Sequence, residues 1–185
     1  MKLLPRESPL KNRDLGYVNF IPHVLKNEVF LVPKYVLPKQ KYYAIEVLDQ
    51  ELIDSSTTFL FAGGDPSLMA ILMSSFFPIW VDRLGGEEIE REVHINNFPF
   101  PEISKKEAKE LLEASSRVFA VRQGISGQML SDLYKKGEMR ENLIMAHEEL
   151  DRIVSKIYGL PKDASNEEIA DFLIKEYQSQ LLENA

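Results

Sequence analysis

The residue types that could do chemistry are few in this chain and lie far apart. Its three histidines are His23, His94 and His147, and no two of them have the His-x3-His spacing that places a pair of metal ligands on one helix face. Cysteine is absent, which excludes a thiolate zinc site, a disulfide framework and a cysteine nucleophile. An acidic run covers residues 87–92, but its alternation is more typical of a solvated strand or a contact surface than of a metal site.

Phosphate-binding and nucleophile motifs are absent as well. Glycine pairs occur at 63–64 and 85–86, but neither belongs to a Walker loop, a G-x-G-x-x-G fingerprint or a G-x-S-x-G elbow. We therefore predict no catalytic residue, no cofactor-binding residue and no metal site in this chain. Whether it is part of an enzyme cannot be decided from these motifs.

The elements expected in the first part are strands followed by one helix. Residues 29–33, 41–48 and 57–62 are rich in aromatic and β-branched residues and are separated by turn residues, which predicts strands. Asp65-Pro66 predicts the start of a helix that runs to about Leu84 and is kinked at Pro78. The alternating charged residues from Glu87 to Ile95 predict an exposed strand or hairpin arm.

The second part of the chain has a helical pattern throughout. Ser104 with Glu107, and later Ser165 with Glu168, form two capping boxes that predict helix starts. Between them, the helix expected over 138–158 has an apolar stripe that ends at Gly159; the stripe consists of Leu143, Ala146, Leu150, Ile153, Val154 and Ile157. The sequence thus predicts an α+β fold: a small mixed strand and helix domain over 1–101, followed by an all-α helical domain over 102–185.

Charge is distributed unevenly along the 185 residues, whose net charge is −7. Residues 1–45 carry eight Lys and Arg against three Asp and Glu, whereas residues 46–101 carry two against ten. A basic first segment can meet phosphate locally, although a lysine-decorated sheet edge is the simpler interpretation. Because there is no signal peptide pattern and no apolar run of membrane-spanning length, we expect a cytoplasmic protein with no membrane partner.

Four segments then carry a family resemblance. The first is Leu72-Met-Ser74-Ser-Phe-Phe-Pro-Ile-Trp80-Val-Asp-Arg83-Leu84-Gly85, and the second is Asn97-Phe98-Pro99-Phe100-Pro101. They are followed by Leu130-Ser-Asp132-Leu133-Tyr134 and by Ala146-His147-Glu-Glu-Leu150-Asp151-Arg-Ile-Val154-Ser-Lys-Ile-Tyr158-Gly159. In order and approximate spacing they resemble a pattern in the MmeI-like restriction–modification enzymes of types IIG and IIL.

Enzymes of that family are large single chains with a nuclease, an adenine-N6 methyltransferase, a target-recognition domain and a helical C-terminal domain. The resemblance implies that residues 1–101 are part of a DNA target-recognition domain and that 102–185 are the helical C-terminal domain. It also implies that S-adenosylmethionine binds in the methyltransferase module of the parent enzyme, outside these residues. The expected partners are double-stranded DNA and that methyltransferase and nuclease module.

Six residues are the expected DNA contacts: Lys39, Lys41, Arg83, Glu87, Arg91 and Asn96. The two lysines can hold phosphate, and Asn96 has the amide that reads adenine. In the family, base choice depends on residues in and after the Arg-Leu-Gly segment, which makes Glu87 and Arg91 the preferred base-reading pair. For Arg83, a phosphate contact and a salt bridge with Asp82 or another nearby carboxylate are equally good interpretations.

A second function fits the same composition. An acidic, helix-rich chain could be a protein–protein interaction module that binds another subunit and never contacts DNA, and the net charge of −7 slightly favours that function.

Overall fold

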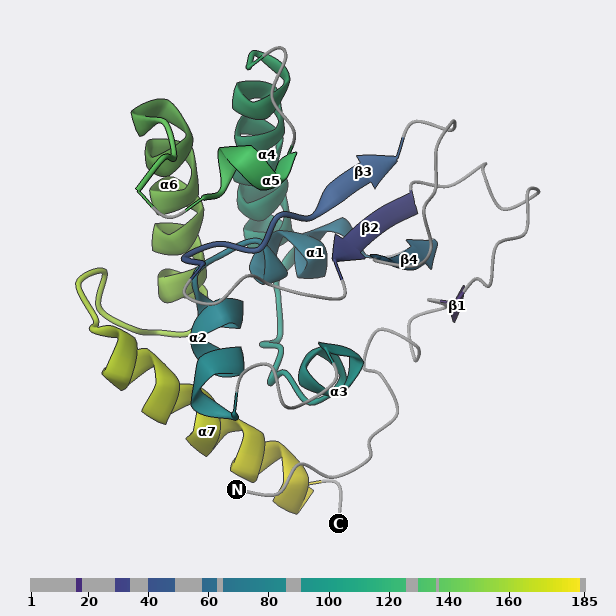
Figure 1. The fold of residues 1–185 in the computed structure, drawn as a ribbon. Helices are drawn as coiled ribbons and strands as arrows, with labels where there is room; N and C mark the ends of the chain where they lie inside the picture. Colours follow the sequence, from purple (N-terminus) through teal and green to yellow (C-terminus); the bar gives the residue numbers. More distant parts are fainter. Residues whose placement is uncertain are drawn as a thin grey trace.

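The helices occupy most of the chain that the structure, a computed structural model, describes. The described residues are 16–17, 29–33, 40–48, 58–62, 65–85, 91–125, 130–135 and 137–183, and for the strands the backbone alone is described. Figure 1 shows the helices packed together on one side and a small sheet on the other.

The sheet contains β1 (Gly16–Tyr17), β2 (Val29–Pro33), β3 (Glu46–Leu48) and β4 (Thr58–Ala62) in the order β1-β4-β2-β3, with every pair antiparallel. Phe30 of β2 stands opposite Val47 on one side and Phe61 on the other. The strand expected over 41–48 is limited to its last three residues. Tyr42, Tyr43 and Ile45 instead turn into the helices and are fully buried there.

The first helical segment consists of two helices, α1 (Pro66–Leu72) and α2 (Phe76–Arg83), and not of one helix kinked at Pro78. Asp65 caps α1 by accepting a hydrogen bond from the Ser67 amide at 2.9 Å. The helix is interrupted after Met73, where the Ser74 hydroxyl donates to the Ile71 carbonyl at 2.6 Å. Since α2 begins at Phe76, Pro78 lies in its first turn, where a missing N–H leaves no hydrogen bond unmade.

The segment expected as a strand or hairpin arm is helical where the structure describes it. α3 (Arg91–Asn96) is a short helix, and residues 86–90 lie outside the described residues. His94 and Ile95 are adjacent and both fully buried. Neighbouring residues of a strand point to opposite faces, whereas on a helix they can share a buried side. The Trp80 indole fixes this segment by donating to the His94 carbonyl at 3.1 Å.

The second part of the chain follows its sequence pattern closely. The two capping boxes open α4 (Lys105–Gln123) and precede α7 (Asn166–Glu183), and both are confirmed by their hydrogen bonds. α5 (Leu130–Leu133) is a single turn, and α6 (Glu141–Ile157) buries the expected apolar stripe against α4. Gly159, at a φ of +70°, ends this helical segment as expected.

The expected α+β fold class is wrong for the core that the structure describes, which is built from helices and the segments that connect them. Every buried side chain that the structure describes comes from a helix or from a connecting segment. Helix α1 packs against α4 and α6, and α2 packs against α7. The reason lies in α1, where all residues after Pro66 are buried. A helix that is apolar on all sides must be enclosed by other elements, so the helices of the two halves form one continuous core. The domain boundary at 101–102 stays a prediction.

No helix among the described residues is both long and apolar enough to cross a membrane.

Candidate nucleic-acid interface

Lys41 is the one described lysine among the expected DNA contacts, and it lies at the surface beside α6. Its ammonium group is 3.5 Å from the Glu148 carboxylate, and both side chains are more than half exposed. The same group lies 5.0 Å from the centre of the Tyr42 ring. Lys41 is therefore paired within the chain, but by a solvated ion pair of the kind that contributes at most about 1 kcal/mol.

Arg83, the last residue of α2, has the salt bridge that the sequence offered as one of two interpretations, but with a distant partner. Its guanidinium donates to the Asp171 carboxylate of α7 at 2.6 Å, and both side chains are about half exposed. Asp82, the neighbour proposed from the sequence, is exposed. The contact links α2 to the last helix and leaves part of the guanidinium open to solvent.

Asn96, the last residue of α3, is only partly accessible. Its side-chain oxygen is buried and has no hydrogen-bond partner among the described residues. The next residue, Asn97, is almost completely buried, and its side-chain oxygen accepts a hydrogen bond from Tyr177 of α7 at 3.0 Å. Adenine recognition needs that oxygen as well as the amide N–H, so the side chain would have to turn outward to read a base.

The other expected contacts fall outside the described side chains. Lys39 and Glu87 lie outside the described residues, and for Arg91 only the backbone, at the first position of α3, is described. The structure thus joins the segments of Arg83 and Asn96 to the same helix, α7, through Asp171 and Tyr177. Lys41 belongs to a different place, against α6.

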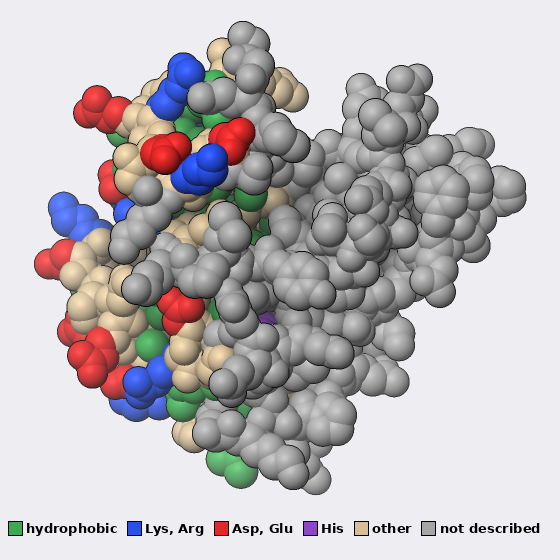
Figure 2. Space-filling model, in the orientation of Figure 1, with side chains coloured by type: hydrophobic (Ala, Val, Ile, Leu, Met, Phe, Trp, Pro, Cys, Tyr) green, Lys and Arg blue, Asp and Glu red, His purple; other side chains and the backbone are tan. Residues whose placement is uncertain are grey.

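Acidic and basic groups alternate over the described helices on the face that Figure 2 shows. The described helices also carry exposed ion pairs such as Arg117 with Glu149, at 2.7 Å, and Lys156 with Glu110, at 3.1 Å. This part of the surface therefore presents no extended field of one sign. Among the described residues, no three His, Asp or Glu side chains gather to hold a metal ion.

A cavity of about 290 Å³ opens between α5 and the start of α6. Its wall includes Asp132 and Lys135, which form an ion pair at 2.7 Å. None of the six expected DNA contacts lines this cavity.

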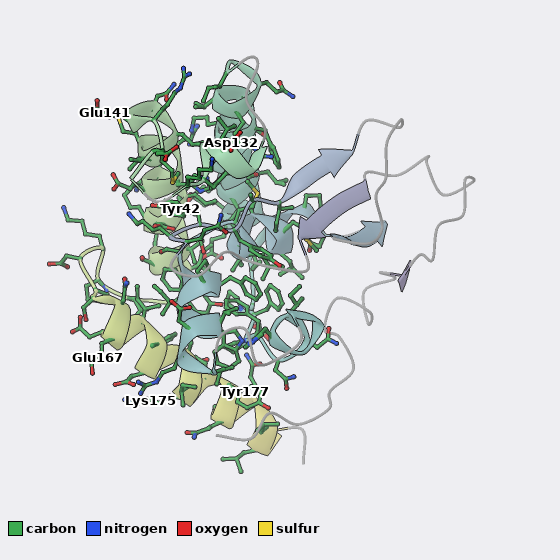
Figure 3. The ribbon with its side chains drawn as sticks, viewed as in Figure 1. Tyr42, Asp132, Glu141, Glu167, Lys175 and Tyr177 are labelled. Atoms are coloured by element: carbon green, nitrogen blue, oxygen red, sulfur yellow. The ribbon has the colours of Figure 1, made fainter. Side chains whose placement is uncertain are left out.

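A buried polar cluster that the sequence analysis missed lies where residues 40–45 meet α6. The Tyr42 ring stacks on the His147 imidazole, with ring centres 4.1 Å apart and 17° between the planes. The Tyr42 hydroxyl donates to the Asp151 carboxylate at 3.2 Å, and the Tyr134 hydroxyl lies 2.8 Å from Nε2 of His147. Figure 3 labels Tyr42 at this junction. The cluster ties three elements together with directional contacts.

Burial dominates the electrostatics of this cluster. It lowers the pKa of His147 to about 3, with the positive charges of Arg122 and Lys41 acting in the same direction. Burial also raises the pKa of Asp151, against the opposing effect of its hydrogen bonds with Ser75. The pKa of Tyr42 is raised by burial and by the nearby Asp151. Near neutral pH the imidazole is uncharged and the phenol keeps its proton, which suits a structural contact better than proton transfer.

One sequence signal could have found this cluster. His147 and Asp151 are one helical turn apart, and they stand among Leu143, Leu150 and Val154 on the side of α6 that faces the core. Polar residues on an otherwise apolar helix face require partners when buried. Their partner Tyr42 is 109 positions from Asp151, and local periodicity does not reveal such a distance.

The comparisons with known proteins agree with this fold. Residues 103–183 match the family described as "MmeI, C-terminal domain". DNA methyltransferase A of Bacillus subtilis (strain 168) is 29% identical over 161 residues, which are 84% of this chain and 18% of that protein. A solved structure of the type IIL restriction–modification enzyme MmeI in complex with DNA matches with a TM-score of 0.76 and 24% identity. The match covers 84% of this chain and 22% of the MmeI chain.

This chain therefore spans about a fifth of the length of each of these relatives. Over residues 103–183 it is similar to the family described as "MmeI, C-terminal domain", and its fold is similar to that of part of the solved MmeI structure.

Proposed function

We propose that this chain is the DNA sequence-recognition and support portion of a restriction–modification enzyme that methylates adenine at N6. The catalytic module, with its S-adenosylmethionine site and any nuclease, belongs to the rest of that enzyme. One observation carries the proposal. The likeness in fold covers 84% of the chain, so it extends well ahead of the matched residues 103–183 into the segments expected to contact DNA.

The described cations are compatible with this function. Lys41 and Arg83 each have a carboxylate partner, but both ion pairs are about half exposed. Exposed pairs contribute little to stability, so exchanging a carboxylate for a DNA phosphate has a small cost. In this proposal Lys39 and Lys41 hold phosphate, Glu87 and Arg91 read a base, and the helices α4, α6 and α7 support the segments that carry them.

The same ion pairs favour the alternative function, a protein–protein interaction module without DNA contact. Glu148 and Asp171 neutralise the two described cations within the chain, whose net charge is −7. A partner for such a surface would be another protein subunit.

Fluorescence anisotropy with a random-sequence duplex at two salt concentrations distinguishes these functions. Phosphate contacts predict binding that weakens as salt rises. The logarithm of the binding constant should fall with the logarithm of the salt concentration, with a slope of about −0.9 for each phosphate held. A Lys39→Ala, Lys41→Ala double variant should reduce that slope, whereas Lys175→Ala, a cation on α7 outside the expected contacts, should leave it unchanged. Absence of binding at both salt concentrations would reject the DNA function in favour of the interaction module.

The cofactor part of the proposal has its own test. Isothermal titration of this chain with S-adenosylmethionine should give no heat of binding, because the chain lacks a glycine-rich cofactor loop. A micromolar dissociation constant would place the cofactor site in these residues and contradict the proposal.

A further inference from the structure

Residues 42–45 form an irregular segment that packs against helices from both halves of the chain. Tyr42, Tyr43 and Ile45 are completely buried. The Tyr43 ring packs against Phe77 of α2 with ring centres 4.9 Å apart. Arg122 of α4 donates to the carbonyl of Ile45 at 2.6 Å. This segment continues directly into strand β3 at Glu46.

A single carboxylate joins this segment to two other elements. The two oxygens of Asp151, on α6, have different partners: one accepts from the Tyr42 hydroxyl at 3.2 Å, and the other accepts from the Ser75 backbone amide at 2.8 Å. Ser75 lies in the break between α1 and α2. Asp151 thus fixes the segment before β3 relative to both α6 and the α1–α2 break.

His147 supports the same contact from one turn earlier on α6. Its ring stacks on Tyr42, while its Nε2 is held by the Tyr134 hydroxyl at 2.8 Å. The hydrogen bond with Tyr134 limits rotation of the imidazole, so its ring presents a flat face of fixed orientation to Tyr42.

These contacts differ from ordinary apolar packing in what they determine. Burial of an apolar side chain favours contact with the core, but it is not directional and so does not fix the position of the segment along its own axis. The hydrogen bond at each end, from Tyr42 to Asp151 and from Arg122 to Ile45, has a preferred distance and angle. Together they set where the segment ends, and hence where the first residue of β3 begins.

We propose that Tyr42, His147 and Asp151 form a positioning site that fixes strand β3, and through it the sheet, relative to the helices. β3 is the edge strand that pairs with β2, and β2 pairs in turn with β4, so a displacement of Ile45 is transmitted along the sheet register. The three residues act through the elements they hold and take no part in chemistry. Their effect on DNA recognition rests on the proposed function.

Hydrogen exchange of the full chain tests the positioning role without DNA. Tyr42→Phe keeps the ring and its stack but removes the hydroxyl that Asp151 accepts. We expect exchange of the β3 amides, residues 46–48, to rise about fivefold, the equivalent of one neutral hydrogen bond, while the α6 amides stay unchanged. Asp151→Asn, which replaces one acceptor oxygen by a donor, should have the same effect.

Tyr158→Phe is the matched control. It also removes a buried tyrosine hydroxyl, one that donates to the Pro99 carbonyl at 3.0 Å, but it does so away from the segment before β3. It should leave the β3 amides unchanged. Equal exchange rates of residues 46–48 in wild type and Tyr42→Phe would overturn the positioning role. An equal rise in the exchange rates of the β3 and α6 amides would overturn it as well.

Duplex binding tests the functional part separately. If the sheet carries recognition residues, Tyr42→Phe should reduce the difference in affinity between a cognate and a random duplex more than Tyr158→Phe does. Faster β3 exchange with unchanged discrimination would overturn this part and leave the positioning role standing. If the wild-type chain binds neither duplex, both the proposed function and the effect on recognition are rejected. The positioning role is then still decided by the hydrogen-exchange result alone.

Discussion

The hydroxyl of Tyr177 donates a hydrogen bond to the side-chain oxygen of Asn97 across 3.0 Å, which connects the last helix to the turn after α3. One turn further along α7, Gln180 donates to the Phe100 carbonyl at 3.2 Å, and Tyr158 at the end of α6 donates to the Pro99 carbonyl at 3.0 Å. Figure 3 labels Tyr177 on α7 below α2. The proline-rich segment 97–101 has no regular structure of its own, and side chains from the helical half add these three hydrogen bonds to its local backbone contacts.

Loss of the Tyr177 hydroxyl should destabilise this connection. Tyr177→Phe removes one donor to a buried amide oxygen, and we expect the free energy of unfolding to fall by about 1 kcal/mol. Urea denaturation followed by circular dichroism measures the change. Ser179→Ala, at an exposed position of the same helix, is the control and should leave the midpoint unchanged. Equal midpoints for both variants would mean that the hydrogen bond contributes nothing to stability.

The apolar stripe of α6 gives a second prediction. Leu150 is fully buried, and truncating such a residue to alanine costs about 2–5 kcal/mol. Leu150→Ala should therefore lower the melting temperature clearly. Met145, on the same helix, is 63% exposed, so Met145→Ala should change stability by less than about 0.5 kcal/mol. Similar melting curves for the two variants would show that the stripe does not face a core.

His147 makes stability depend on pH in a defined direction. Its pKa is lowered by burial from 6.5 to about 3, so the unfolded chain takes up a proton first as the pH falls. Stability is then lost from about pH 6.5 downward, by about 2 kcal/mol between pH 7 and pH 5. His147→Gln, which cannot titrate, should have a shallower decline over that range in denaturant melts. Parallel curves for the variant and wild type would contradict the lowered pKa.

Two glycines that follow helices allow a test of backbone strain. Gly159 has a φ of +70° and open space around its Cα, so Gly159→Ala should cost about 1–2 kcal/mol through conformation alone. Gly124 has an ordinary φ of −70° at the end of α4, and Gly124→Ala should be near neutral. The midpoints of chemical denaturation compare the two. An equal effect would indicate that Gly159 does not need its left-handed conformation.

The proposed DNA function gives a prediction on specificity. In the enzyme that carries this chain, Arg91→Ala should broaden the methylated motif at one base pair, because a bidentate base contact contributes about 1–3 kcal/mol of discrimination. The Lys39→Ala, Lys41→Ala double variant should keep the motif and lower overall methylation, since phosphate contacts carry no sequence information. Methylome sequencing separates these results. Altered specificity in the lysine variant, with an unchanged motif for Arg91→Ala, would place the reading surface on the other segment.

Local sequence rules predicted the second half of the chain well. Ser104 with Glu107, Ser165 with Glu168, and Gly159 act on neighbours within a few residues, so their effects can be read without knowing the fold. The apolar period of α6 likewise identified its buried face, because a 3.6-residue repeat has one structural interpretation over five turns.

The first half was harder because its residues depend on distant partners. Pro78 was expected to kink one helix, but the break came earlier, where Ser75 could give its amide to Asp151, 76 positions away. The alternating charged residues from Glu87 to Ile95 predict a strand or hairpin arm, yet α3 is a helix in which the neighbours His94 and Ile95 are both buried. Tertiary contacts override a short local pattern when they bury more apolar surface than the locally favoured structure would.

The sequence by itself determined the capping boxes before α4 and α7, the helix α6 with the face that it buries, and the end of that helical segment at Gly159. It also determined the absence of cysteine and of known catalytic motifs. Only the tertiary structure decided that helices of both halves share one core, that Lys41 and Arg83 face the carboxylates of Glu148 and Asp171, and that Tyr42 meets His147 and Asp151. Capping and periodicity are interactions over one or two turns, whereas buried polar groups find partners wherever the packed chain brings them, at separations that no local pattern encodes.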